Sequence, residues 1–579
     1  MPPIMADFQQ TLIQRFADAL ANAFGDEVAE VDPLIGPAKN PRFGDYQANV
    51  AMSLGKRLGS NPRQVAEKIV EHLDVADLCE PPTIAGPGFI NLRLTDAALA
   101  DHARALAGDA AMGIAPAADP QTVVVDYSSP NVAKEMHVGH LRSTVIGDAL
   151  VRVLEAAGHR VIRQNHLGDW GTQFGMLIET MADTGVAAGA QTFHVGDLNE
   201  LYRQAKARFD QDAAFADRAR QRVVLLQAGD PDSVNLWHQL VAESQRHFNE
   251  AYDRLGVRLA DEDVRGESAY NAHLPEVIQA LVDAGVARQS EGAIVVFVDG
   301  YESPMIVRKR DGGYGYDATD LAALRYRVQQ LDADRLIYVT DARQGEHFAK
   351  LFDAGRRMGW LDNAAAEHVT FGMVLGEDNR PFKTRSGDTV RLRDLLDEAR
   401  QRAAAIVAEK NPDLTEIERQ QVARVVGIGA IKYGDLSSDR SRDYVFSWNR
   451  MLAMDGNTAP YLQYAYARIR SIFRRGQVDP ATLGAGELTV GDPAERALVL
   501  KLAQLPGVVR AVAANLQPHH LCTYLYELAT TFSSFYEQCP VLRADDAAAR
   551  TSRLVLCDLT ARALERGLGL LGIDVLERM

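Results

Sequence analysis

The chain has 579 residues, of which 47% are apolar and 24% charged, an ordinary globular composition. At roughly 150 residues per domain, this length suggests three or four domains. Its 62 Lys and Arg against 78 Asp and Glu give a formal net charge of −16, which argues against a protein that coats nucleic acid non-specifically. A specific RNA partner is compatible with this charge, because phosphate contacts need only a local basic surface.

The ends of the chain and its cysteines indicate a cytoplasmic protein. No run approaches the ~18 consecutive apolar residues of a membrane span. The first residues, MPPIMADFQQ, lack the basic start and apolar segment of a signal peptide. The 4 cysteines are far apart and include no CxxC pair, which fits a reducing compartment. We expect a cytoplasmic monomer without membrane contact.

In chain order, the first part mixes helix and turn signals. FQQTLIQRFADALANAF has helical periodicity, and TIAGPGFINLRL is punctuated by Gly and Pro. An Ala-rich stretch follows. This change of pattern predicts an N-terminal domain over residues 1–115.

From Gln121 onward, short β-branched runs alternate with helical patterns. QTVVVDYS predicts a buried strand, LRSTVIGDALVRVLEAAG a helix that ends at Gly158, and HRVIRQNHLGDWG the next strand and its loop. Strand, helix and strand at this spacing form a βαβ unit, which implies a parallel sheet. The later runs AIVVFV, PMIVRK, DRLIYVTD and HVTFGMVLG predict further strands.

Two long segments lack strand patterns. Residues 175–265 are polar and helical, which predicts an insertion within the α/β domain of residues 116–392. After Leu392 the patterns are helical as far as Met579. We divide this part into a connecting segment, 393–452, and an all-α domain, 453–579.

The loop that follows the first strand of the α/β domain has an unusual composition. It contains DYSSPNVAKEMHVGHLRST, in which His137 and His140 flank Gly139. Ligands of open parallel sheets bind at the carboxyl ends of the strands. The helix that begins here offers unpaired N–H groups and a positive dipole end, which suit an anion such as the phosphates of ATP. Glycine allows a flat adenine or ribose to approach the backbone, and the imidazoles can donate hydrogen bonds to phosphate oxygens.

A metal site is the alternative interpretation of two histidines three residues apart. No Cys, Asp or Glu cluster nearby completes a ligand set, so we predict no metal here. HVGH between a βαβ strand and its helix resembles the HIGH motif of class I aminoacyl-tRNA synthetases. That resemblance implies a Rossmann-type parallel-sheet catalytic domain that binds ATP.

Longer strings narrow the resemblance to one member of that class. SSPNVAKEMHVGHLRST and NHLGDWGTQFG are similar to the catalytic domain of bacterial arginyl-tRNA synthetases. FGDYQAN and AGPGFINL resemble the α+β N-terminal domain that these enzymes place against the tRNA elbow. TAPYLQYAYARIRSI resembles the start of their helical anticodon-binding domain. These matches span nearly the whole chain.

An arginine pocket requires fixed carboxylates and acceptors that face a planar guanidinium. Tyr316 and Asp320 are four residues apart at a predicted helix start, so they share a face. The residues alone leave open that Asp317 or Asp320 only complements the helix dipole. The resemblance assigns the guanidinium to Tyr316, Asp320 and Glu267. By the same resemblance, Asn131 orients the substrate's α-amino or carboxyl end, Gln344 lies on the substrate side and His347 reaches ATP.

The second ATP loop of class I synthetases, KMSKS, is only loosely matched here. Its place is taken by Phe382-Lys383-Thr384-Arg385-Ser386, in which Ser386 stands where the second lysine would be. Lys383 and Arg385 of the loop, or Lys134 three residues before His137, are alternative sources of the missing charge. A loop with such cations is also compatible with simple solvation.

The stretch ARIRSIFRR concentrates arginines after two tyrosines. We predict that Tyr461, Tyr464, Arg468 and Arg470 contact tRNA, because aromatic rings stack on splayed bases and arginines pair with phosphates. A solvated helix face is the alternative interpretation of such a charge run.

The resemblance implies an arginine–tRNA ligase that acts in two transfers. Arginine's carboxylate attacks ATP to give arginyl-adenylate and pyrophosphate, and the terminal adenosine of arginine tRNA then takes the arginyl group and releases AMP. Magnesium arrives with ATP, and no tightly bound cofactor is expected. Two alternatives share part of the pattern: a small-molecule ligase of the same superfamily, such as a pantoate-activating enzyme, and a catalytically silent RNA-binding paralogue.

Overall fold

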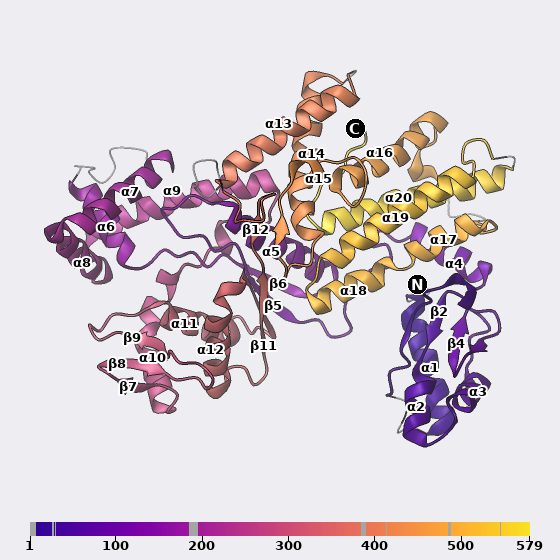
Figure 1. Ribbon diagram of the computed structural model, residues 1–579, viewed down its shortest axis with the longest axis horizontal. Helices are drawn as coiled ribbons and strands as arrows, with labels where there is room; N and C mark the ends of the chain where they lie inside the picture. The colour runs from indigo at the N-terminus through magenta and orange to yellow at the C-terminus, as the bar shows by residue number, and fades with distance from the viewer. Residues whose placement is uncertain are drawn as a thin grey trace.

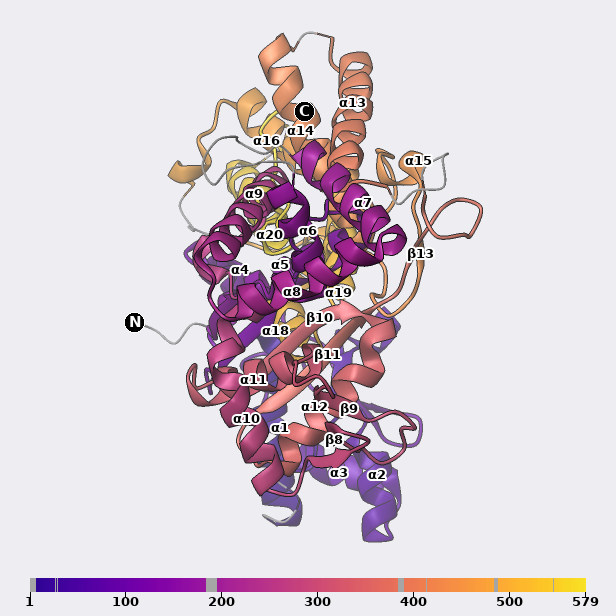
Figure 2. The same cartoon turned by 90° about the vertical axis from the view of Figure 1, so that its left-hand side faces the viewer.

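The structure is a computed structural model that describes residues 7–579 except 26, 27, 29, 184–194, 384–389, 413, 484–487 and 545. Figure 1 shows three regions: the α/β part with its insertion, a long helical part, and an N-terminal unit that contacts the helical part. In Figure 2 the insertion helices lie above the parallel sheet and a small antiparallel sheet lies below it.

The N-terminal unit is α+β, as expected. Its elements are α1 (Phe8–Phe24), β1 (Ile35–Pro37), β2 (Tyr46–Ala48), α2 (Val50–Leu58), α3 (Pro62–His72), β3 (Thr83–Ala85), β4 (Phe89–Leu92) and α4 (Asp96–Ala107). The antiparallel sheet has the order β1-β2-β4-β3. Arg496 and Arg510 of the helical part pair with Asp45 and Asp7 of this unit, which joins the two regions.

The predicted βαβ unit is the centre of the α/β part. Its elements are β5 (Thr122–Asp126), α5 (Val138–Ala156), β6 (Arg160–Gln164), β10 (Arg335–Asp341), α12 (Gly345–Arg357) and β11 (Ala365–Phe371). The strands pair in parallel in the order β11-β10-β5-β6. Val, Leu and Ile side chains at successive positions of β5 and β10 are buried, which explains the short apolar runs of the sequence.

Two of the predicted strands lie outside the parallel sheet. AIVVFV and PMIVRK form β8 (Ala293–Val296) and β9 (Met305–Arg308), which pair antiparallel with each other and with β7 (Arg288–Ser290). The connection over residues 297–304 is too short for a parallel crossover, which needs about a dozen residues. This small sheet packs with α10 (Leu274–Asp283) and α11 (Tyr316–Gln329).

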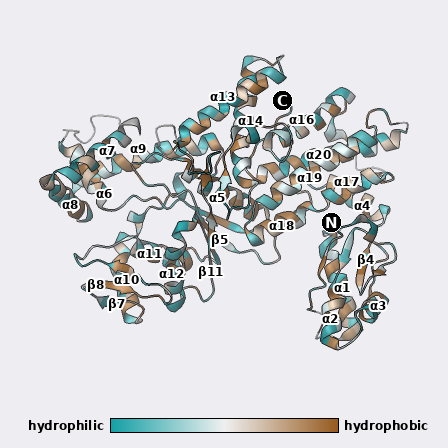
Figure 3. Ribbon diagram, viewed as in Figure 1, coloured by the Kyte–Doolittle hydropathy of each residue, from teal (hydrophilic) through white to brown (hydrophobic). Residues whose placement is uncertain are grey.

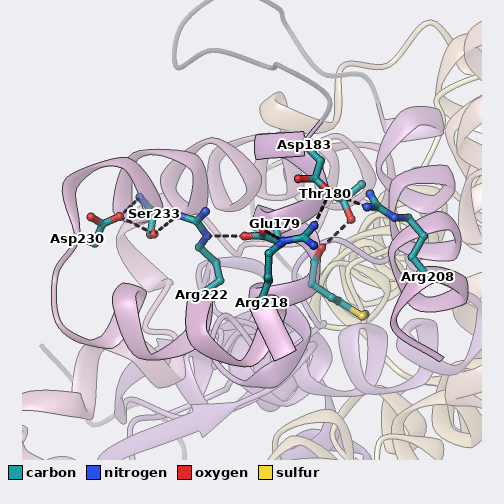
Figure 4. A network of polar contacts seen from close by, with 9 residues as sticks. Glu179, Thr180, Asp183, Arg208, Arg218, Arg222, Asp230 and Ser233 are labelled. Carbon is teal, nitrogen blue, oxygen red and sulfur yellow. Dashed lines mark hydrogen bonds and ion pairs between the residues drawn. The ribbon is translucent and has the colours of Figure 1, made fainter. Parts of the chain in front are cut away.

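The part of the chain between β6 and the small antiparallel sheet contains four long helices among its described residues. They are α6 (Thr172–Asp183), α7 (Val195–Gln211), α8 (Ala213–Gln227) and α9 (Pro231–Leu255). Figure 4 shows the ion pairs that join these helices: buried Glu179 of α6 accepts hydrogen bonds from Arg218 and Arg222 of α8 at 2.8 and 2.9 Å. Asp183 accepts hydrogen bonds from Arg218 and from Arg208 of α7.

The part after Leu392 is a helical bundle. Its helices are α13 (Leu392–Lys410), α14 (Glu416–Leu436), α15 (Trp448–Met451), α16 (Ala459–Gly476), α17 (Pro493–Leu502), α18 (Leu505–Asn515), α19 (His519–Gln538) and α20 (Ala547–Leu570). Figure 3 shows hydrophobic and hydrophilic residues on the same helices, as expected where one face is buried. Residues 493–515 are apolar enough for a membrane span by composition, but they form α17 and α18 and pack against α19 within the bundle.

The expectation that strands end before Leu392 is wrong in one detail. Two residues of this part, Tyr444–Val445, form β13 and pair in parallel with β12 (Val374–Leu375). A two-residue strand has no periodicity that a sequence pattern can reveal. The domain boundaries at 115, 392 and 452 stay predictions.

A buried ion pair joins the α/β part to the bundle. Arg142 of α5 lies with Nε 3.1 Å from Asp435 Oδ2 of α14, and both side chains are almost fully buried. The Nη1 atom of Arg142 also donates to the carbonyl oxygen of Gly372 at 2.7 Å. The helix that carries the HVGH sequence is therefore fixed to the bundle through a desolvated charge pair.

We predict that Asp435→Ala lowers the thermal midpoint clearly, because removal of one partner from a buried pair costs about 3–5 kcal/mol. Asp217→Ala is the control: Asp217 pairs with Arg220 on α8, but both side chains are largely exposed, so the midpoint should not change measurably. Equal midpoints for the two variants would contradict the role of the buried pair.

Candidate active site

A cavity of about 770 Å³ opens at the carboxyl ends of β5 and β10. This is where an open parallel sheet binds its ligand. Most of the predicted site residues line it, namely Asn131, His137, Gly139, His140, Glu267, Tyr316, Asp320, Gln344 and His347. Residues from four separate stretches of sequence therefore meet around one cavity.

The loop that leaves β5 is held by hydrogen bonds from three directions. The Ser128 N–H donates to Ser143 Oγ at 2.9 Å, and the Ser129 N–H donates to Asn165 Oδ1 at 3.0 Å. The Ala133 N–H donates to Ser244 Oγ of α9 at 2.9 Å. These three loop residues have positive φ, which non-glycine residues adopt only where surrounding contacts fix them.

His137 and His140 cap the helix that follows. His137 Nδ1 accepts from the Gly139 N–H at 3.0 Å, and His140 Nδ1 accepts from the His137 N–H at 3.1 Å. The Val138 N–H donates to the carbonyl oxygen of Val390 at 3.0 Å. The expectation that unpaired backbone N–H groups of this helix face an anion is therefore wrong, because the histidines and Val390 satisfy them.

The caps determine the charge and tautomer of both imidazoles. A nitrogen that accepts a backbone N–H carries no proton, so the proton of each neutral ring lies on Nε2. Burial, with the partner His137 and Lys134, lowers the pKa of His140 to about 3, and burial with Lys134 lowers the pKa of His137. Both rings are neutral Nε2–H donors at pH 7.

Two glycines fit closely against side chains of the site. A Cβ on Gly139 would lie 2.8 Å from His137 Cε1, so glycine makes room for the capping ring. A Cβ on Gly168, in the loop after β6, would lie 2.2 Å from Asn131 Oδ1. Asn131 and Gly168 also form an isolated parallel bridge, which fixes the Asn131 backbone.

Asp320 faces the cavity between two imidazoles. Its Oδ2 lies 2.6 Å from His347 Nε2, and its Oδ1 lies 3.4 Å from His166 Nε2. Burial alone would raise its pKa, but contacts with His166 and His347 hold the pKa of Asp320 well below its usual range. Asp317 instead accepts the Ile306 N–H at 2.7 Å and ties the helix start to β9. Asp317 also lies in the first turn of α11, where a carboxylate complements the helix dipole.

Glu267 comes from the 3-10 helix Glu267–His273 and lines the same cavity. Its N–H donates to the Leu167 carbonyl at 3.0 Å, and next to it Ser268 Oγ donates to Asp169 at 2.6 Å. Burial raises the pKa of Glu267 to about 7, with Asp320 and Asp169 adding to the rise against the opposing effect of His166. Asp320 and Glu267, whose carboxylates differ in pKa, therefore line the same cavity.

The remaining lining residues lie nearer the rim. Tyr316 begins α11 and is 64% exposed, and its ring packs edge-on against His347 at 5.2 Å between centroids. Gln344 ends the 3-10 helix Ala342–Gln344, just before α12. His347 contacts Asp317 and Asp320 and so lies beside the carboxylate predicted for the substrate.

The cations considered for the second ATP loop are placed differently. Lys134 does not line this cavity: its Nζ lies 5.1 Å from the centre of the Tyr202 ring, in a neighbouring groove. Lys383 is exposed and does not line the cavity either. Arg385 and Ser386 lie outside the described residues.

Of the residues predicted to contact tRNA, some are engaged within the protein. Arg470 pairs with Glu577 at 2.9 Å and Asp558 at 3.5 Å. Arg468 lies over the ring of Tyr536, and Tyr461 packs against Tyr526. Tyr464 is 45% exposed.

Two groups at this site, His166 and Arg327, are not among the residues predicted from the sequence. His166 lies in the HLGDWG loop, where its position directly after a strand of the βαβ unit was a usable signal. Buried Arg327 pairs with Asp126 at 2.7 Å and donates to Gln164 at 2.6 Å, which fixes the ends of β5 and β6. Among the described residues, no group of three or more His, Cys, Asp or Glu could hold a metal ion.

Comparison with known families gives one consistent result. The family described as "tRNA synthetases class I (R), catalytic domain" matches residues 103–448. "Arginyl tRNA synthetase N terminal domain" matches residues 10–94 and "DALR anticodon binding domain" residues 462–579.

Full-length relatives agree with these matches. The arginine–tRNA ligase of Synechococcus elongatus is 52% identical, with 98% of this chain and 99% of that protein covered. That of Thermobifida fusca is 51% identical, with 99% and 100% covered.

Solved structures agree as well. The arginyl-tRNA synthetase of Plasmodium falciparum has a TM-score of 0.87 at 31% identity, covering 99% of this chain and 100% of that one. The Thermus thermophilus arginyl-tRNA synthetase has a TM-score of 0.81 at 26% identity, covering 99% and 100%. The chain therefore belongs to the arginyl-tRNA synthetases, class I ATP-dependent ligases that join L-arginine to arginine tRNA.

Proposed function

We propose that the substrate guanidinium binds between Asp320 and Glu267, with Tyr316 and Gln344 beside it. The position of the Asp320 carboxylate, ionised and facing the cavity, carries this assignment. A guanidinium presents five N–H donors in a plane, and two carboxylates on one cavity can accept several of them. Asn131 lies at the β5 end of the cavity, where it can orient the α-amino or carboxyl group.

ATP is assigned to the other end, at His137, Gly139 and His140. The neutral Nε2–H groups of the two histidines can donate to phosphate oxygens as negative charge develops in the transfer at the α-phosphorus. The cavity holds the carboxylate of arginine next to the α-phosphorus of ATP, so that the two substrates react directly. No side chain forms a covalent bond in this scheme. Mg²⁺ enters with ATP, held mainly by phosphates and water.

Three further assignments complete the proposal. Contacts with the phosphates of ATP are assigned to Lys383 and Arg385 of the second loop, and an electrostatic effect on the two histidines is assigned to Lys134. His347 serves the arginine side through Asp320 rather than ATP. The enzyme acts as a cytoplasmic monomer without membrane contact.

For the tRNA, we assign contact to the exposed face of α16. Tyr464 is available to stack on a base, with Tyr461 and Arg468 beside it. Arg470 instead stabilises the last residues of the chain through its pair with Glu577.

We predict that Asp320→Asn raises the KM for arginine by two or more orders of magnitude. Loss of one charge from a desolvated, hydrogen-bonded pair costs about 2–5 kcal/mol. The KM for ATP should change little, and affinity for the neutral isostere citrulline should fall far less than that for arginine. A variant with a lower melting temperature and a normal arginine KM would remove Asp320 from the pocket.

We expect Gly139→Ala to reduce kcat for ATP–pyrophosphate exchange, measured with arginine and tRNA present. The added methyl would displace the His137 ring, and loss of one well-placed donor costs up to about 10²–10³-fold in kcat. Gly345→Ala is the matched control, because its Cβ would meet nothing within 4 Å at the start of α12. Unchanged exchange in Gly139→Ala would contradict the capping role of His137 in ATP binding.

Tyr464→Ala should weaken tRNA binding, because loss of one stacking ring costs about 1–3 kcal/mol. Arg470→Ala is the comparison: it should lower the melting temperature through loss of the Glu577 and Asp558 contacts and change the KM for tRNA less. The reverse pattern, with tRNA affinity lost only in Arg470→Ala, would reassign the contact.

A further inference from the structure

His166 is a buried histidine of the cavity that the proposed reaction does not use. Its side chain is 12% exposed, and its N–H backbone group donates to Ser129 Oγ at 3.2 Å, which fixes its position. Its Nε2 lies 3.4 Å from Asp320 Oδ1, off hydrogen-bond geometry, and neither ring nitrogen has a hydrogen-bond partner among the described residues. The ring is held in place by packing, with Tyr270 at 5.8 Å between centroids.

The second imidazole at Asp320 has a different environment. His347 lies 2.6 Å from Asp320 and, through its other nitrogen, 3.3 Å from Asp317. His347 therefore still contacts the Asp317 carboxylate when another cation pairs with Asp320. Among the described residues, His166 has an ion pair with Asp320 alone.

The other charged and titratable groups around His166 come from each neighbouring element. Asp126 of β5 favours the charged ring, but it is paired with Arg327 of α11, which opposes that charge. Glu267 and Asp169 add negative potential from the 3-10 helix and the loop after β6. Tyr338 and Tyr270 are neutral, because burial raises the pKa of each phenol. Burial lowers the pKa of His166, but Asp320 and Asp126 outweigh it and raise that pKa above 6.5.

A guanidinium at Asp320 would change this balance. It is always protonated, so it adds a full positive charge within a few ångströms of the His166 ring. Two cations would then share one largely desolvated carboxylate. A like charge at this distance disfavours the protonated imidazole, and burial disfavours it further. The imidazole is the partner that can lose its proton.

We propose that His166 is a proton-linked counter-ion of Asp320, which neutralises the carboxylate before arginine binds and releases its proton to solvent when the guanidinium replaces it. This proposal rests on the proposed function, because it requires the guanidinium to pair with Asp320. His166 is then a positioning and specificity residue, since only a cationic side chain triggers the release. His347 remains charged through Asp317.

The test is a titration of the histidine ring resonances by NMR in the full-length enzyme labelled with ¹³C-histidine. His166→Gln identifies the His166 signal. The matched control is His368→Gln, which removes a histidine that does not line the cavity and is hydrogen-bonded to Thr340. Burial lowers the pKa of His368 to about 4. With saturating L-arginine, the His166 midpoint should fall by about one pH unit or more, and with citrulline it should stay unchanged. A midpoint that arginine leaves unchanged or raises overturns the proposal.

Calorimetry gives a second readout, in which the variants separate the proton of His166 from that of Glu267, whose pKa of about 7 a bound guanidinium would also lower. Arginine binding to the wild-type enzyme, measured in two buffers of different ionisation enthalpy, should release protons to the buffer. Since the free enzyme holds the proton, wild-type affinity for arginine should rise with pH between the bound and free midpoints. That slope should be shallower in His166→Gln, by up to about tenfold per pH unit, and unchanged in His368→Gln.

The outcomes distinguish the role of His166 from the position of the arginine site. Equal slopes in wild type and His166→Gln overturn the role of His166 but leave the arginine site intact. Absence of any arginine heat or spectral change contradicts the proposed arginine site, and the counter-ion proposal falls with it.

Discussion

The backbone conformation of the loop between β5 and α5 is the constraint on which the site depends. Ser128, Ser129 and Ala133 all have positive φ, with values of 70°, 44° and 61°. Such conformations cost on the order of 1–3 kcal/mol each and persist only where neighbours determine them. The neighbours are side chains: Ser143 on α5, Asn165 after β6 and Ser244 on α9. Without these contacts the chain would not deliver Asn131 and His137 to the same cavity.

The helical insertion therefore contributes to the active site, although it lies outside the sheet. Tyr252 of α9 contacts Ser128 Oγ at 2.8 Å and accepts from Asn165 at 3.1 Å. Its hydroxyl joins the two strand-end loops in a buried network, where polar groups must be satisfied by each other. The ion pairs of Glu179 hold α6 against α8 in the same insertion. The loop between β5 and α5 is therefore held by α9 of the insertion as well as by the strand that it leaves.

Local sequence patterns predicted the helices and strands that depend on neighbouring residues. They did not predict the pairing of β8 and β9 or side-chain contacts with residues far along the chain. The βαβ unit, with HVGH between its first strand and its helix, could be predicted because the strand, helix and turn signals lie within about forty residues of each other. β8 and β9 were recognised as strands, but no pattern reveals which strand they pair with. Arg470 looked available in ARIRSIFRR, because its partner Glu577 lies 107 residues away. His166 had a local signal in its position after a strand, but the contact that gives it a role is with Asp320, far along the chain.

The cavity separates two kinds of histidine, and the separation follows from what each Nδ1 contacts. His137 and His140 accept backbone N–H groups, which excludes a proton there and keeps each ring neutral. His347 faces two carboxylates, and although burial opposes it, their contacts raise the pKa of His347 to about 9. Neutral donors therefore line the end assigned to phosphates, and cationic rings line the end assigned to arginine.

This arrangement keeps the carboxylate ready for its substrate. An isolated buried carboxylate would tend to take up a proton, and a protonated acid cannot pair with a guanidinium. His166 and His347 keep Asp320 ionised, and His166 is replaceable because an imidazole, unlike a lysine or arginine, can give up its proton near neutral pH. A lysine at position 166 would hold Asp320 equally well but would compete permanently with arginine. A histidine at position 166 can therefore neutralise the Asp320 carboxylate in the free enzyme and still allow a cationic substrate to bind there.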